Sequence, residues 1–260
     1  MVGRVLLRGL INPKISKASG VVLDSRISTV LIKPFVNKNN IDMTEYEVPR
    51  HGYPSFNEFF YRKRKQEYLI NNDGTTLICP CDGLLTIKDI DEDTILRIKH
   101  SEYSVKELLH SNKGGERYAG GQALIFRLTP GHYHRYDYCT NGVVTRVKRI
   151  PGVLHCVRPI AVGRIPVFTQ NTREYQIIKN DVLGKVTQME VGAMLVGKIS
   201  NLKKQAGIEV TSGEEKGYFE YGGSTIIVLL PNKLKLNEEI INRAKIDGEI
   251  PVKIGEILVD

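Results

Sequence analysis

A serine that could do covalent chemistry stands in the stretch GYFEYGGSTIIVLL, residues 217–230. Ser224 follows two glycines and opens a run of apolar, mostly β-branched residues, so the pattern predicts a glycine turn that leads into a buried strand. Such a turn is an ordinary structural feature, because glycine and serine are common turn residues. A hydroxyl at this place can also act as a nucleophile when a base lies beside it. Whether Ser224 is only a turn residue or a nucleophile depends on the polar side chains that the other stretches supply.

Several upstream stretches carry side chains that could supply a base or bind an anion. Asp82 lies in PCDG, on a turn before an apolar run. The stretch GHYHRYD, residues 131–137, places two histidines two positions apart, which puts them on one side of an extended segment. Histidine titrates near neutral pH, and arginine suits carboxylate and phosphate groups. The stretches PGVLHCVRP, residues 151–159, and NTREY, residues 171–175, carry further candidates. Together the candidates are Asp82, His132, His134, Arg135, His155, Arg158 and Arg173.

Residues 1–70, which precede all of these candidates, are predicted to be helical. Residues 27–35 form an apolar segment that is expected to kink or end near Pro34. Ser55 and Glu58 have the spacing of a capping box that opens a short helix. The basic string at residues 62–65 is typical of a solvated helix end, and it also suits the edge of an anionic surface.

From about residue 76 onward, short apolar runs alternate with Gly, Pro, Asn and Asp, which is typical of antiparallel strands. The sequence predicts an α+β fold, with N-terminal helices followed by a mostly antiparallel β-sandwich or barrel-like core. Strands are expected at 84–87, 123–128, 142–147, 175–178, 185–191 and 226–230, with helices at 104–110 and 237–244.

The composition is that of a soluble globular protein with an acidic partner. The 260 residues carry a net charge of +8, which favours nucleic acid or anionic lipid as a partner. No nucleic-acid motif is recognised, so we expect no nucleic-acid partner. The four cysteines have neither zinc-site nor disulfide spacing, which indicates reduced thiols in the cytoplasm and no metal. The apolar N-terminus is too short to span a bilayer and lacks a cleavage site, so neither a transmembrane segment nor a signal peptide is expected.

Taken in order, the motifs resemble those of the phosphatidylserine decarboxylases, a family of self-processing enzymes that use a pyruvoyl cofactor. The resemblance covers nearly the whole chain from the segment around Asp24. It runs through SFNEFFYRK, PCDG, YHR, PG-x-L-x-x-V-x-P, NTREY, QMEVGAMLVGKI, KGYFEYGGST and IPVKIGE. No one of these motifs is decisive, but so many in one order are highly specific.

The resemblance implies that Ser224 attacks the carbonyl of Gly223 and that the chain is cut between them. The serine remnant becomes a pyruvoyl group at the new N-terminus, which forms a Schiff base with phosphatidylserine and releases CO2 to give phosphatidylethanolamine. The long and short fragments are expected to stay together, because the short one begins with a core strand. By resemblance, Asp82 orients the processing base, and His134 belongs to the decarboxylation site and can reprotonate the substrate carbon.

The chain departs from the better-known family pattern at Asp137. Those members read Y-H-R-x-H, and their last histidine is the processing base, whereas this chain reads YHRYD. An ordinary carboxylate, with a pKa near 4, is a weaker base than imidazole, with a pKa near 6.5. Either another imidazole substitutes, with His155 first and His132 second, or self-cleavage is slow or absent.

Arg135, Arg158 and Arg173 are the expected ligands of the lipid phosphate. Residues 1–70 are expected to dock on the cytoplasmic face of an anionic membrane, and residues 71–260 to form the catalytic domain. Two alternatives stay open: a pyruvoyl decarboxylase of a soluble amino acid, and an unprocessed relative that binds lipid or protein without catalysis. The oligomeric state is left open, with a homodimer among the options.

Overall fold

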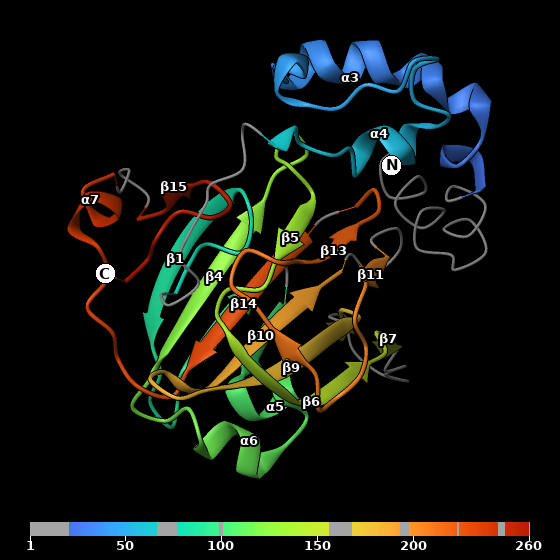
Figure 1. Ribbon diagram of the computed structural model, residues 1–260. Coiled ribbons are helices and arrows are strands. Elements are labelled where there is room, and N and C mark those ends of the chain that lie inside the picture. Colours follow the sequence, from blue (N-terminus) through green and yellow to red (C-terminus); the bar gives the residue numbers. More distant parts are fainter. Residues whose placement is uncertain are drawn as a thin grey trace.

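The computed structural model describes residues 21–66, 77–98, 101–155, 168–192, 198–222, 224–243 and 248–259, with only the backbone described for 153–155 and 168–170. Short N-terminal helices lie over one end of a set of β-sheets, and α5 and α6 lie at the opposite end (Figure 1). The predicted α+β class, with helices first and mostly antiparallel strands after them, is confirmed.

Within the described residues, the largest sheet has eight antiparallel strands in the order β12-β6-β9-β10-β14-β4-β1-β15. All six predicted strands belong to this sheet. Its strands are β1 (Gly83–Asp89), β4 (Gln122–Leu128), β6 (Gly142–Ile150), β9 (Arg173–Asn180), β10 (Gly184–Val191), β12 (Glu209–Val210), β14 (Ser224–Leu230) and β15 (Ile250–Val252). Strand β14 lies between β10 and β4, and all seven of its residues are buried, as its continuous apolar run predicts.

The two faces of this sheet are covered differently. Side chains alternate along each strand, so Ile226 and Val228 of β14 share one face, while Ile227 and Leu229 share the other. The first face packs against a three-stranded sheet, β11 (Ile199–Asn201), β13 (Glu215–Phe219) and β5 (Arg135–Asp137). The second packs against α5 (Val105–Leu109) and the hairpin β2 (Ile95–Ile98) and β3 (Ser101–Ser104). The strands β7 (Val153–His155) and β8 (Phe168–Gln170) pair separately.

The described helices and 3₁₀ helices are short. They are η1 (Arg26–Leu31), α3 (Ile32–Asn39), η2 (Met43–Glu45), α4 (Phe56–Phe60), α5, α6 (Asn112–Glu116) and α7 (Glu238–Ile241). Ser55 caps α4 as expected, its hydroxyl accepting the Glu58 N–H at 3.2 Å, and Ser104 and Glu107 form a full capping box on α5. No described helix is both long and apolar enough to cross a membrane.

The N-terminal segment that is predicted to kink or end near Pro34 changes from a 3₁₀ helix to an α-helix just before that residue. The chain passes from η1 into α3 at Ile32, so Pro34 falls in the first turn of α3. The N–H groups in the first turn of a helix have no acceptor within the helix, so the missing N–H of proline breaks no hydrogen bond there. The helix therefore continues through Pro34.

The cysteines within the described residues are buried free thiols, namely Cys79, Cys81 and Cys139. Burial raises the pKa of each of these thiols. Cys156 lies outside the described residues.

Candidate active site

Ser224 is the first residue of the central strand β14 and is 2% exposed. It pairs with Leu128, the last residue of β4, and its hydroxyl donates to the carbonyl of Gly222 at 3.3 Å. Gly222 has a φ of 152°, a conformation that favours glycine. The strand register thus brings Ser224 beside the turn that leaves β4, where the histidine pair lies.

His132 lies in this turn, and its hydrogen bond fixes its tautomer. The backbone N–H of Thr129 donates to His132 Nδ1 at 3.1 Å, so the neutral ring carries its proton on Nε2. Burial lowers the pKa of His132, although the negative charge of Asp82 opposes this shift. The neutral ring is therefore a proton donor at Nε2.

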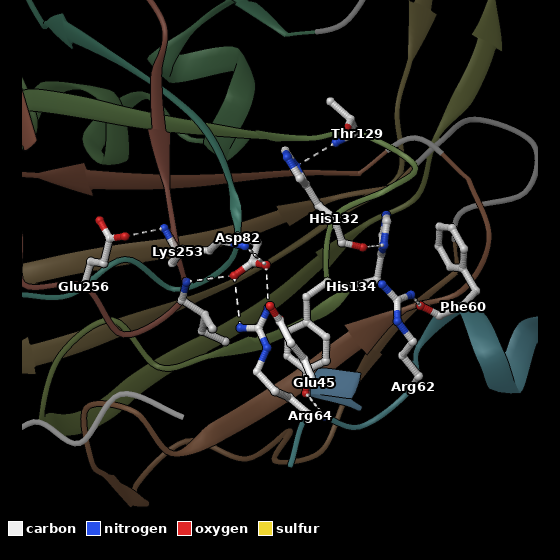
Figure 2. Close-up of polar contacts among 12 residues, drawn as sticks. Glu45, Phe60, Arg62, Arg64, Asp82, Thr129, His132, His134, Lys253 and Glu256 are labelled. Carbon is white, nitrogen blue, oxygen red and sulfur yellow. Dashed lines mark hydrogen bonds and ion pairs between the residues drawn. The ribbon is translucent and has the colours of Figure 1, made fainter. Parts of the chain in front are cut away.

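His134 has the opposite tautomer. Its Nδ1–H donates to the carbonyl of His132 at 2.9 Å, which leaves the Nε2 lone pair as the proton-accepting position of the ring. Burial, together with the positive charge of Arg62, lowers the pKa of His134 to about 3. The ring lies against Phe60, with centroids 3.9 Å apart, and the Arg62 guanidinium lies beside it (Figure 2). His134 is thus neutral at physiological pH, with the lone pair of Nε2 free.

Helix α4 packs His134 and the segment before Ser224 into one unit. The Asn57 side chain accepts the Tyr221 N–H at 3.3 Å, and the Tyr221 ring packs edge-on against Phe60 at 5.1 Å. The carbonyl of His134 accepts the Phe219 N–H at 2.9 Å. The turn that precedes Ser224 is therefore held against the face on which His134 lies.

Asp82 is 2% exposed and immediately precedes β1. Arg64 donates to both of its carboxylate oxygens, at 3.3 and 2.8 Å, and the backbone N–H of Ile254 donates at 3.0 Å (Figure 2). Burial acts to raise the pKa of Asp82, but Arg64 and Lys253 outweigh it and the pKa is lowered. Within the described residues, the carboxylate's hydrogen bonds go to Arg64 and Ile254 and not to a histidine.

Asp137 lies half-buried in β5. Burial and the neighbouring negative charge of Glu215 raise the pKa of its carboxyl to about 8, although Arg64 opposes this shift. Its proton affinity therefore exceeds that of an ordinary imidazole. The sequence argument that a carboxylate is too weak a base assumed a solvated aspartate, and the burial changes that premise.

The two predicted phosphate ligands that the structure describes, Arg135 and Arg173, are not brought together. Arg135 forms an ion pair with Glu215 and donates to the carbonyl of Tyr61 at 2.8 Å. Arg173 lies on the opposite face of the large sheet, where it donates to the carbonyls of Leu108, Glu107 and Asn171. Arg158 lies outside the described residues.

Two other predicted site residues cannot be placed in the site. Gly223 lies outside the described residues. His155 ends β7 and pairs with Phe168, and its side chain is outside the described part.

Comparison with known proteins gives a consistent match. The family model described as phosphatidylserine decarboxylase matches residues 56–260. The chain is 41% identical over 259 residues to phosphatidylserine decarboxylase proenzyme 2 of Clostridium acetobutylicum, covering 98% of this chain and 87% of that protein. The chain belongs to the phosphatidylserine decarboxylase family. A proenzyme from Clostridium tetani is 41% identical over 91% of this chain and 81% of its own length, and one from Ruminiclostridium cellulolyticum is 39% identical over 98% and 87%.

Phosphatidylserine decarboxylases are pyruvoyl-dependent carboxy-lyases, and their proenzymes carry a pyruvoyl group made from a serine. The surroundings of Ser224 fit such a group. The residue is buried at the start of a strand that hydrogen-bonded neighbours flank on both sides, so a new N-terminus there is held in place. His134 offers an uncharged proton-accepting nitrogen on the adjoining packed unit.

Sequence reasoning missed Arg62 and Arg64, because it took the basic string after α4 as a solvated helix end. That interpretation was wrong for these two residues, which are 1% and 6% exposed. The residues on either side of Arg64, Lys63 and Lys65, lie nearer the surface. An alternation of arginine with lysine in an extended segment was the available signal, since arginine is the residue suited to buried ion pairs.

Proposed function

We propose that this chain is a phosphatidylserine decarboxylase proenzyme that cleaves itself between Gly223 and Ser224. The observation that carries the proposal is the buried position of Ser224 at the first residue of the central strand, on the unit that contains His134. The Ser224 oxygen attacks the Gly223 carbonyl and the peptide C–N bond breaks, which gives an ester and a free amine at position 224. Elimination then releases the Gly223 carboxylate, and water replaces the nitrogen of position 224, which leaves as ammonia, to give the pyruvoyl group. The fragment 224–260 stays bound because β14 is hydrogen-bonded to β4 and β10, which belong to the larger fragment.

Asp137 is our proposed base for this cleavage. It occupies the position at which better-known members of the family have a histidine, and burial gives its carboxyl a pKa of about 8. A carboxylate with that proton affinity can take the proton of a serine hydroxyl about as well as an imidazole can. Asp82, held by Arg64, supplies fixed negative charge beside it.

His134 is our proposed proton carrier in the decarboxylation. When formed, the serine-derived pyruvoyl group supplies a carbonyl that delocalises the electron pair left by the departing CO2. His134 Nε2 takes up a proton in the substrate complex and passes it to the carbon that has lost its carboxylate. Packing against Phe60 and the Nδ1–H hydrogen bond hold the ring in the tautomer that this requires.

The proposed partner surface is the cytoplasmic face of an anionic membrane, to which residues 21–31 bind. Apolar side chains of this segment are exposed, among them Ile27 at 79% and Val30 at 71%. The chain also carries a net charge of +8. Phe35 of α3 packs against Phe56 and Tyr221, so the exposed apolar segment adjoins the turn before Ser224. A lipid held at this surface would lie next to the site.

Intact-mass analysis of the purified protein tests the proposal. We expect two fragments, with the smaller one beginning at position 224 and blocked by pyruvoyl, and a single full-length mass for Ser224→Ala. An uncleaved wild-type chain after long incubation with membranes would instead support the unprocessed binding protein. Decarboxylation measured on phosphatidylserine vesicles and on free amino acids then separates the lipid substrate from a soluble one.

A further inference from the structure

Arg62 is a buried cation without a carboxylate partner among the described residues. It is 1% exposed, and its Nε and Nη2 atoms are buried without a hydrogen bond. Nη1 makes one long hydrogen bond, 3.4 Å to the carbonyl of Phe60. The guanidinium lies over the rings of Tyr46, at 4.1 Å, and Phe59, at 5.1 Å. Aromatic faces offset part of the cost of burying this charge, but they satisfy neither free nitrogen.

Arg64, two residues further on, is a buried arginine whose charge is neutralised by carboxylates. It also lies near the Tyr46 ring, but it forms ion pairs with Asp82 at 2.8 Å and Glu45 at 3.5 Å. Of these two neighbouring buried arginines, only Arg62 lacks a carboxylate partner among the described residues. Burying a charge without a counter-ion costs free energy. An anion that bound to Arg62 would supply the missing counter-ion, so Arg62 is a candidate anion-binding residue.

The free atoms of Arg62 have the geometry that binds oxyanions. Nε and Nη2 form one edge of the guanidinium, and two parallel N–H groups there match the two oxygens of a carboxylate or phosphate. Arg127 of this same chain uses that edge to bind both oxygens of Glu249, at 2.9 and 2.6 Å. In Arg62 the same edge is buried, and no hydrogen-bond acceptor among the described residues occupies it.

Arg62 also lies where the substrate must bind if the proposed function holds. Its charge contributes to the lowered pKa of His134, and its guanidinium lies beside the His134 ring (Figure 2). Phe60, the last residue of α4, packs against both His134 and Tyr221. Tyr221 lies three residues before Ser224 in the sequence. An anion on Arg62 would therefore lie next to the proton carrier.

We propose that Arg62 binds the phosphodiester of the lipid headgroup through its Nε–Nη2 edge. This inference rests on the proposed function. Of the two anionic groups of phosphatidylserine, the carboxylate is lost in the reaction, and an ion pair with it would stabilise the reactant more than the transition state. The phosphodiester keeps its charge throughout. Its binding also cancels the positive charge next to His134 at the stage when that ring takes up a proton.

The test is made on the uncleaved Ser224→Ala protein, in which binding is separated from chemistry. Calorimetry with glycerophosphoserine, glycerophosphoethanolamine and free serine compares the Ser224→Ala protein with its Arg62→Gln and Arg127→Gln derivatives. We expect Arg62→Gln to weaken both phosphodiesters about tenfold or more and Arg127→Gln to weaken neither. A loss confined to glycerophosphoserine would assign Arg62 to the carboxylate instead, and an unchanged affinity for both would overturn the proposal.

A second measurement covers the case in which Arg62→Gln does not fold. In the Ser224→Ala protein, the NMR titration of His134 should shift to higher pH when glycerophosphoethanolamine is added, and Arg62→Lys should keep that shift with weaker binding. No shift on saturation would contradict the proposal. Cleavage of the wild-type chain, followed by intact mass, reports separately on the proposed function, so the failure of one is distinguishable from failure of the other.

Discussion

At the scale of single residues, burial sets the proton affinities that the chemistry needs. The site contains a carboxyl whose pKa is raised to about 8, at Asp137, and an imidazole whose pKa is lowered to about 3, at His134. Removal from water disfavours the charged form in both cases, which raises the pKa of an acid and lowers that of a base. Groups with such pKa values gather at functional sites.

The pH dependence of self-cleavage tests the role of Asp137. Only the ionised carboxylate accepts a proton, and its fraction rises as the pH rises through the pKa. We expect the cleavage rate to increase about tenfold per pH unit below pH 8 and to level off above it. Asp137→Asn should remain full-length, whereas His132→Ala and His155→Ala should be cleaved. If His155→Ala alone stopped cleavage, His155 would be the base.

The decarboxylation step tests His134 separately. Because its pKa is lowered to about 3, the ring is neutral throughout the range from pH 5 to 8, and activity should show no loss near pH 6.5 from its protonation. His134→Ala should lower kcat by a factor on the order of 10²–10⁴ while the chain is still cleaved. Retention of normal kcat by a cleaved His134→Ala protein would remove this residue from the mechanism.

At the scale of elements, a buried polar cluster joins the two sheets next to the proposed cleavage position. Lys216 lies at a bulge in β13, and its Nζ donates to Glu190 of β10 at 2.6 Å and to Asn201 of β11 at 3.2 Å. Both charged side chains are fully buried. Strand β13 leads into the turn before Ser224, and β10 pairs with β14, which begins at Ser224. The Lys216–Glu190 pair therefore fixes how these two strands approach each other.

A double-mutant cycle measures this link. Lys216→Met leaves the Glu190 carboxylate buried without its partner and should lower the free energy of unfolding by about 3–5 kcal/mol. The double variant Lys216→Met, Glu190→Gln removes both charges and should recover most of that loss. Denaturant unfolding gives the free energy of unfolding of the four proteins in the cycle. All four carry Ser224→Ala, so that each unfolds as a single uncleaved chain. Strict additivity would show that the pair is not coupled.

At the scale of the whole molecule, the exposed apolar segment and the proposed active site lie at the same end of the sheets. Helices α3 and α4 cover the end at which β5 and β13 lie (Figure 1). The cluster formed by Phe56, Phe59 and Phe60 packs against Phe35 of α3 and Tyr221. Membrane contact and substrate entry are thus expected through one surface.

Vesicle binding tests this arrangement. Replacing Ile27 and Val30 by serine removes exposed apolar groups and should weaken binding to anionic vesicles, while activity on a short-chain, water-soluble phosphatidylserine stays unchanged. Val182→Ser is the matched control, because this side chain is 87% exposed but lies in the turn between β9 and β10. Sedimentation with vesicles gives the bound fraction. Equal loss in the control would argue for a non-specific effect of lowered hydrophobicity.

The sequence by itself determined six strands of the large sheet, the caps of α4 and α5, and the place of Ser224. The unbroken apolar run after it predicts a strand buried on both faces, and local patterns of this kind depend only on neighbours along the chain. The serine and glutamate spacings that predict the starts of α4 and α5 are local in the same way.

Only the tertiary structure decided which polar groups are charged and which have partners. Arg64 meets Asp82 across 18 positions of sequence, and Asp137 acquires its raised pKa from burial and from Glu215 on another strand. Arg62 looks like a solvated cation in the sequence, whereas in the described part of the fold it is buried without a counter-ion. Burial and charge environment are sums over segments distant in sequence, so no local pattern could have specified them.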